Sequence, residues 1–126
     1  MTMTSPLRVA LIGTGHIAAE HVEALRAQGA GVHISAATDV NADALAAFCA
    51  THAIPQAYAD STSLLQREQP DVVLISTPPF THAALAAQAM EAGADVVCEK
   101  PMVVSLEQMD ALLESYLGPI AARSGA

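Results

Sequence analysis

Five short apolar runs recur along the chain, and each is followed by a segment whose apolar residues repeat at helical spacing. Two clear examples are Leu7–Ile12, which precedes a glycine, and residues 71–77, which precede two prolines. Continuous apolar runs of this length are typical of parallel strands buried on both faces. The pattern predicts a doubly wound, Rossmann-like α/β fold with about five strands and helices on both faces of a parallel sheet. The predicted strands are residues 7–12, 32–39, 54–60, 71–77 and 94–100. Three helices are predicted at residues 16–28, 61–68 and 81–92. A further helix is predicted to be capped by Asn41 and to run through His52, and a last one to be opened by a capping box at Ser105–Gln108.

The composition limits the chain to one globular domain. Its 126 residues are 52% hydrophobic and 14% charged, which provides one sizeable core and leaves no room for two full domains. We expect this domain to occupy residues 1–117 and a loose tail to follow at residues 118–126. The formal net charge of −8, with five scattered Lys and Arg residues, argues against a surface that binds nucleic acid or a membrane.

The N-terminal apolar run and the cysteines bear on the compartment. The run stops at Gly13, which makes it too short for a secretory signal or a membrane span. Cys49 and Cys98 fall in apolar helix and strand patterns with no CxxC spacing, so we expect buried thiols rather than a disulfide. These features favour a cytoplasmic location.

The motif GTGHIA after the first run matches the G-x-G-x-x-[GA] pattern of dinucleotide-binding turns. In that pattern Gly13 permits the tight turn, Gly15 lets a pyrophosphate approach the backbone, and Ala18 lets the helix pack close to the strand. Amides of the first helical turn then point at the phosphates. Alone, the motif is equally compatible with a plain tight turn. The predicted cofactor-binding residues of this turn are Gly13, Thr14, Gly15, His16, Ile17 and Ala18.

Asp39 ends the second predicted strand, twenty-one residues after Ala18. A carboxylate at this point can accept hydrogen bonds from the adenosine ribose hydroxyls and would repel a 2′-phosphate. The sequence therefore favours NAD over NADP as the cofactor. The alternative is an aspartate that only caps a turn or a helix.

Two further motifs follow the fourth and fifth predicted strands. In STPPFTH, the position at the carboxyl end of a strand makes Thr77 and Pro78 candidates for the wall of a cofactor site, and the alternative is a proline-stiffened turn with Thr81 as a helix cap. In CEKP, Glu99 can orient Lys100, and a desolvated lysine there can bind a substrate oxygen and help to move its proton. The alternative for Lys100 is a solvated side chain after a strand.

Other kinds of site are not indicated. No His or Cys pair has the HExxH or CxxC spacing of a metal site, so we expect no bound metal. No GxSxG motif or Cys–His pairing signal indicates nucleophilic catalysis.

Taken together, the segments ALIGTGHIA, DVVLISTPPFTHAALAAQAMEAGADVVCEKP and SLEQMDALL resemble the Gfo/Idh/MocA oxidoreductase family, over about Leu7 to Leu113. The resemblance implies an NAD(P)-binding domain in which a nicotinamide carries the hydride, with a sugar, cyclitol or related polyol as substrate. It implies that residues Gly13–Ala18 bind the pyrophosphate and that Asp39 binds the adenosine ribose. It further implies that Ser76, Thr77, Pro78 and His82 line the cofactor groove, that Glu99 lies near the nicotinamide ribose, and that Lys100 contacts the substrate as the catalytic lysine.

Members of this family carry a second domain that supplies further substrate-binding groups, and this sequence has no counterpart of it. We therefore expect a cofactor-binding domain that is incomplete as an enzyme, with two alternatives: a non-catalytic dinucleotide-binding or regulatory module, and a truncated remnant. For His82, the alternative to a cofactor contact is a histidine that packs on its own turn. The fifth strand would be an uncovered sheet edge, which makes self-association possible.

Overall fold

The computed structural model describes residues 6–27 and 31–98. The predicted tail, the predicted helix at Ser105–Gln108, and the residues Glu99 and Lys100 lie outside these ranges. The elements are β1 (Leu7–Ile12), α1 (His16–Arg26), β2 (Val32–Thr38), α2 (Ala42–His52), β3 (Gln56–Tyr58), α3 (Ser61–Glu68), β4 (Val72–Ile75), the 3₁₀ helix η2 (Pro79–Thr81), α4 (His82–Glu91) and β5 (Asp95–Cys98).

The described strands form one parallel sheet in the order β3-β2-β1-β4-β5. The chain starts in the centre with β1, adds β2 and β3 on one side, and returns to the other side of β1 for β4 and β5. The strand order therefore reverses between β1 and β4. In an open α/β sheet, this is where ligands bind, outside the carboxyl ends of the strands.

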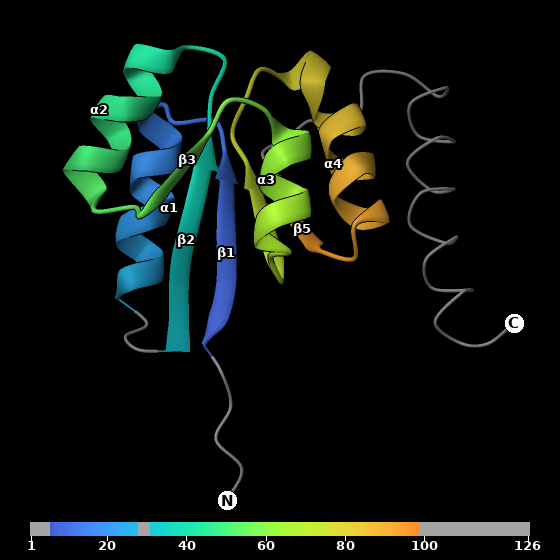
Figure 1. The fold of residues 1–126 in the computed structure, drawn as a ribbon, viewed down its shortest axis with the longest axis horizontal. Helices are drawn as coiled ribbons and strands as arrows, with labels where there is room; N and C mark the ends of the chain where they lie inside the picture. The colour runs from blue at the N-terminus through green and yellow to red at the C-terminus, as the bar shows by residue number, and fades with distance from the viewer. Residues whose placement is uncertain (1–5, 28–30, 99–126) are drawn as a thin grey trace, which may run out of the picture.

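Helices cover both faces of the sheet, as predicted for a doubly wound fold. In Figure 1, α1 and α2 lie to the left of β1 and β2, and α3 and α4 lie to their right. The core is correspondingly split into two apolar clusters of buried residues. One includes Val9, Leu11 and Val22 on the α1 side, and the other includes Ala10, Ile12 and Leu64 on the α3 side. Successive β1 residues thus alternate between the two clusters.

Side-chain caps explain where α2 and α3 begin. The Asn41 side chain accepts a hydrogen bond from the Ala44 amide at 2.9 Å, which confirms the predicted cap of α2. Asp60 does the same for α3, accepting from the Ser63 amide at 2.7 Å. By contrast, Gly15 precedes α1 and supplies no side-chain cap. The first amides of α1 are therefore left without an acceptor from a capping side chain.

A bulge interrupts the pairing of β1 with β2. Val9 pairs with Ile34, but the next residue, Ala10, pairs with Ala36, so Ser35 is an extra residue in β2. Ile34 consequently packs in the α1-side cluster and Ala36 in the α3-side cluster, although residues two apart in a regular strand share a face. The Ser35 hydroxyl is buried and has no hydrogen-bond partner among the described residues.

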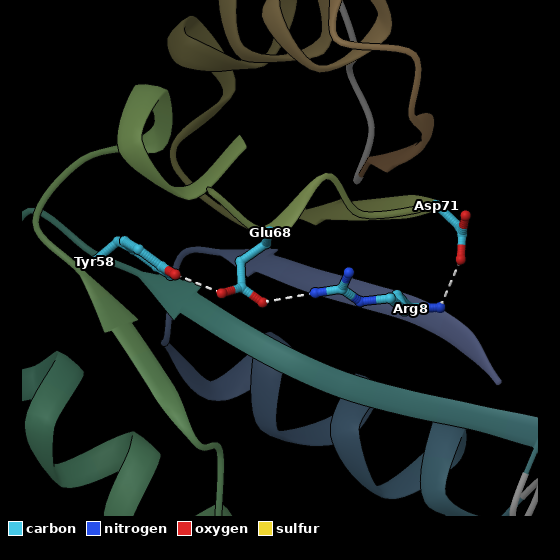
Figure 2. Close-up of polar contacts among 4 residues, drawn as sticks. All are labelled: Arg8, Tyr58, Glu68 and Asp71. Carbon is cyan, nitrogen blue, oxygen red and sulfur yellow. Dashed lines mark hydrogen bonds and ion pairs between the residues drawn. The ribbon is translucent and has the colours of Figure 1, made fainter. Parts of the chain in front are cut away.

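Three polar side chains form a cluster under α3, which we call the Glu68 cluster: Arg8, Tyr58 and Glu68. Glu68, at the end of α3, is 8% exposed. Its Oε1 accepts a hydrogen bond from the Arg8 guanidinium at 3.0 Å, and its Oε2 accepts one from the Tyr58 hydroxyl. Figure 2 shows the carboxylate lying between its two donors. The Glu68 cluster therefore ties β1, β3 and α3 together.

The edge strand and the cysteines are less buried than the sequence suggested. Val97 in β5 is 49% exposed, and Cys49 and Cys98 are both half-buried thiols rather than fully buried ones. Val97 and Cys98 are less covered because β5 pairs only with β4 among the described residues. Cys49, on α2, packs against the α1-side cluster but is only partly buried by it. Within residues 6–27 and 31–98, none of the helices has the length and apolar character that crossing a membrane requires.

Candidate functional site

The carboxyl ends of β1, β2 and β4 bring the predicted site residues together. The Gly13 amide donates to the Thr38 carbonyl at 2.9 Å, which joins the glycine turn to the end of β2. The Ser76 amide donates to the Ile12 carbonyl at 2.9 Å, which joins the end of β4 to the same turn. Residues from three separate sequence motifs therefore meet at the point where the strand order reverses.

Gly13 and Gly15 of the turn differ in whether the fold requires a glycine at that position. Gly13 is buried, has a φ of +102°, and a Cβ there would lie 3.0 Å from the Ser76 backbone. The fold itself therefore requires glycine at this position. Gly15 is exposed, has an ordinary φ of −83°, and a Cβ there would meet nothing within 4 Å. No contact among the described residues requires Gly15 to lack a side chain.

Asp39 points its carboxylate at the glycine turn. Its Oδ2 accepts hydrogen bonds from both the amide and the hydroxyl of Thr14, at 2.9 and 2.7 Å. Its Oδ1 accepts from the Asn41 amide at 2.9 Å. The carboxylate is half-buried and links the turn before α1 to the turn before α2. It thus occupies the position predicted for a ribose-binding group and also has structural partners.

These hydrogen bonds determine the charge of Asp39. Partial burial by itself raises the pKa of the carboxyl group, but the hydrogen bonds from Asn41 and Thr14 outweigh it and hold the pKa below its usual value. Asp39 is therefore ionised at neutral pH. An ionised carboxylate accepts hydrogen bonds from hydroxyl groups and repels phosphate.

The first turn of α1 contains the rest of the GTGHIA motif. Ala18 is 1% exposed and packs with Val9 and Leu11 of β1 in the α1-side cluster, where a larger side chain would push the helix from the sheet. Ile17 is 40% exposed. The His16 ring is also exposed and lies 3.6 Å from Glu20, so it faces its own helix rather than the turn.

The loop after β4 is braced by its own side chains. The Thr81 hydroxyl donates to the Pro78 carbonyl at 2.7 Å and lies 2.5 Å from the Thr77 hydroxyl. Thr81 precedes α4 but makes no capping hydrogen bond with its side chain. This corrects the alternative in which Thr81 caps the helix: its hydroxyl turns back into the loop because the 3₁₀ turn at Pro79–Thr81 brings the Pro78 carbonyl within reach.

His82 lies inside the protein rather than on the surface of the site. Its side chain is buried, at 1% exposure, and its Nε2 is 2.7 Å from the Thr77 carbonyl. A carbonyl only accepts, so Nε2 carries the proton. The ring therefore supports the loop after β4 through the Thr77 carbonyl.

Two exposed apolar residues follow strand ends at this edge of the sheet, and sequence reasoning did not single them out. Val40, next to Asp39, is 104% exposed, and Phe80, in the loop after β4, is 71% exposed. Both follow the carboxyl end of a strand, as Ile17 does in the glycine turn. For Val40, the signal that was available is an apolar residue directly after Asp39, beyond the end of the strand pattern.

The remaining sequence predictions concern residues or ligands that the structure does not describe. Glu99 and Lys100 lie outside the described residues. Within residues 6–27 and 31–98, no three His, Cys, Asp or Glu side chains are arranged to hold a metal ion.

The fold and this edge define a doubly wound α/β domain with a glycine turn of the dinucleotide-binding type. The chain belongs to the GFO_IDH_MocA family, described as an oxidoreductase family with an NAD-binding Rossmann fold, whose model matches residues 7–116. The resemblance seen in the sequence is thereby confirmed.

Individual relatives agree with this assignment. An inositol 2-dehydrogenase from Pseudarthrobacter chlorophenolicus is 34% identical over 115 residues, which are 90% of this chain and 34% of that protein. Among solved structures, the WlbA dehydrogenase from Bordetella pertussis, in complex with NADH and UDP-GlcNAcA, has a TM-score of 0.83 at 26% identity and matches 90% of this chain and 35% of that one. The 3-ketoreductase KijD10 from Actinomadura kijaniata, in complex with NADP and TDP-benzene, has a TM-score of 0.78 at 26% identity, over 90% of this chain and 34% of that one. The chain thus spans about a third of the length of these relatives.

Proposed function

We propose that this chain binds NAD at the carboxyl edge of β1, β2 and β4, as the cofactor-binding part of an oxidoreductase that acts on a sugar, cyclitol or related polyol. The observation that carries the proposal is the contact between Asp39 and Thr14, which aims a charged ribose-binding group at the glycine turn. The relatives named inositol 2-dehydrogenase support the class of substrate.

The geometry of the turn fits a pyrophosphate. Gly15 is exposed with open space beside it, and α1 begins there without a side-chain cap. The first amides of an eleven-residue helix are therefore available to an anion, and the helix dipole favours negative charge at the same end. Because the formal net charge of the chain is −8, this local attraction has to overcome a repulsive overall field.

The proposed roles of the individual residues follow from their positions. The backbone of residues 13–18 holds the pyrophosphate, and Asp39 accepts hydrogen bonds from the adenosine ribose. Ser76, Thr77 and Pro78 form the opposite wall next to Gly13, with His82 supporting Thr77 from inside. A nicotinamide ring supplies hydride transfer when the cofactor is bound. Glu99 and Lys100 keep their predicted roles, near the nicotinamide ribose and at the substrate.

NAD is proposed over NADP because of charge. The pKa of Asp39 is held below its usual value, so the carboxylate is ionised and would lie against a 2′-phosphate. The solved relatives include complexes with NADH and with NADP, so the preference rests on this residue.

Titration calorimetry with NAD and NADP tests the proposal. We expect the 126-residue chain to bind NAD, to bind NADP more weakly, and to lose about ten- to a hundredfold in NAD affinity in the Asp39→Ala variant. The exposed surface carboxylate Glu23 on α1 provides the matched control, Glu23→Ala, which should leave NAD affinity unchanged. Failure of the folded wild-type chain to bind NAD at millimolar concentration would refute the proposal and favour the truncated remnant.

A second expectation concerns turnover. Since the chain spans about a third of its relatives, we propose that it does not turn over a polyol by itself, although it binds the cofactor. Positioning of the substrate contributes several kcal/mol of barrier lowering in enzymes, and the groups that would do so are expected on a second domain. Assay of a polyol panel with NAD tests this. Turnover abolished by Lys100→Ala would show instead that the chain is a complete enzyme.

The domain limits, the cytoplasmic location and self-association through the sheet edge remain predictions.

A further inference from the structure

Thr14 contacts Asp39 through two different groups. Its amide and its hydroxyl both donate to Oδ2, while the Asn41 amide holds Oδ1. Thr14 itself is 8% exposed, so water has little access to its hydroxyl. The carboxylate is therefore held at both oxygens, and Thr14 alone supplies two of these hydrogen bonds.

The two Thr14 contacts differ in origin. Any residue at position 14 other than proline would supply the amide, but only a hydroxyl side chain supplies the second hydrogen bond. That bond joins residues 25 apart in the chain. Hydrogen bonds to an ionised group are stronger than neutral ones and favour its charged form. The Thr14 hydroxyl is also one of the groups that lower the pKa of Asp39.

We infer that Thr14 is a positioning residue that fixes the orientation of the Asp39 carboxylate, and that it thereby sets both NAD affinity and discrimination against NADP. The inference rests on the proposed function. A carboxylate held at both oxygens meets the ribose without first losing rotational freedom. It also cannot turn away from an incoming 2′-phosphate, whereas a carboxylate freed from Thr14 can.

The alternative is that the Thr14 hydroxyl competes with the ribose for Oδ2 of Asp39. An oxygen that accepts two hydrogen bonds from Thr14 has little acceptor capacity left. If the ribose needed that oxygen, the Thr14 hydroxyl would compete with the ligand, and removing it would strengthen NAD binding. The sign of the change in affinity therefore separates the two cases.

The test uses three substitutions of Thr14 and one control substitution in the full chain, with NAD and NADP titrated by calorimetry. Thr14→Val and Thr14→Ala remove the hydroxyl, and we expect each to weaken NAD binding about three- to tenfold while lowering the ratio of the NADP to the NAD dissociation constant. Thr14→Ser restores the hydroxyl and should bring both quantities within about twofold of wild type. Thr51→Val changes an exposed threonine late in α2 and is the matched control.

Valine brings a methyl group close to the carboxylate and could prevent folding. If Thr14→Val does not fold, Thr14→Ala is the variant that tests the inference. Unchanged or tighter NAD binding in Thr14→Ala would overturn the inference, as would a serine variant no better than alanine. The proposed function is tested separately within the same series. If Asp39→Ala loses NAD binding and Thr14→Ala does not, only the role of Thr14 is rejected; if the wild type does not bind NAD, both fail.

Discussion

Asp39 and Glu68 are both carboxylates that accept hydrogen bonds from this chain, but the structure uses them differently. The partners of Glu68 are side chains from β1 and β3, and the group is almost fully buried in the Glu68 cluster (Figure 2). Asp39 accepts hydrogen bonds from the backbone amides of Thr14 and Asn41, and the group stays half-buried at the carboxyl edge. Glu68 therefore holds elements of the fold together. Asp39 is oriented by the fold and remains accessible, which is what a ligand-binding group needs.

The largest expected effect is at Gly13, a residue of the carboxyl edge that belongs to the fold. Gly13→Ala should destabilise the chain by roughly 2–4 kcal/mol, because alanine is strained at a φ of +102° and its Cβ would meet the Ser76 backbone. Urea denaturation followed by circular dichroism measures this. A decrease in the free energy of unfolding of less than about 1 kcal/mol would show that Gly13 belongs with the ligand-facing residues instead.

Gly15→Ala is the matched substitution two residues later, and it should affect the ligand more than the fold. We expect a stability loss of only about 0.5–1 kcal/mol from a poorer N-cap. NAD affinity should fall about ten- to a hundredfold, because the methyl group would enter the space left for the pyrophosphate. Calorimetry and denaturation on the same samples test both halves. Unchanged NAD affinity would remove the distinction between the two glycines.

Glu68→Ala should lower stability and leave NAD affinity unchanged, which is the reverse of the effect expected for Gly15→Ala. Removing the buried carboxylate takes away the partner of both Arg8 and Tyr58, and we expect the free energy of unfolding to fall by about 1–2 kcal/mol. The loss is no larger because the Arg8 side chain is 42% exposed, so water screens its ion pair. NAD affinity of the folded protein should not change. Glu23→Ala again serves as the surface control and should stay within about 0.5 kcal/mol of wild type. A loss of NAD affinity in Glu68→Ala would mean that the two regions are coupled.

The smallest effect concerns acid pH. Because the pKa of Asp39 is lower in the folded chain than in the unfolded chain, its ionisation stabilises the fold at pH values above the unfolded pKa. This contribution is lost as the pH falls below the unfolded pKa and through the lower folded pKa. The difference in unfolding free energy between wild type and Asp39→Asn should therefore shrink between about pH 6 and pH 3. A difference that stays constant over this range would contradict the charge assigned to Asp39.

Local sequence patterns predicted the elements well. The bounds of β1 and α3 and the cap at Asn41 agree with the structure, because apolar periodicity and capping residues act within a few positions of one another. The carboxyl ends of β2, β3 and β4 were predicted one or two residues too long. Polar residues such as Asp39 follow the strand pattern but lie beyond the last paired residue.

Contacts between distant residues were not predictable in this way. The bond from Thr14 to Asp39 spans 25 residues, and the pair of Arg8 and Glu68 spans 60. Nothing in the local pattern around His82 distinguishes a ring that contacts a ligand from one that supports Thr77 from inside. Such contacts depend on how the strands are ordered and paired, and a single sequence shows these only through motifs that have a known arrangement.

The bulge at Ser35 has a consequence four residues further on. An added residue in an extended chain reverses the direction of every side chain that follows it. It also sets Thr38 opposite Ile12, at the height where the glycine turn begins. Without the extra residue, the β2 residues after Ile34 would present their side chains to the opposite faces of the sheet. The extra serine, whose hydroxyl has no hydrogen-bond partner among the described residues, thus determines the face on which β2 ends just before Asp39.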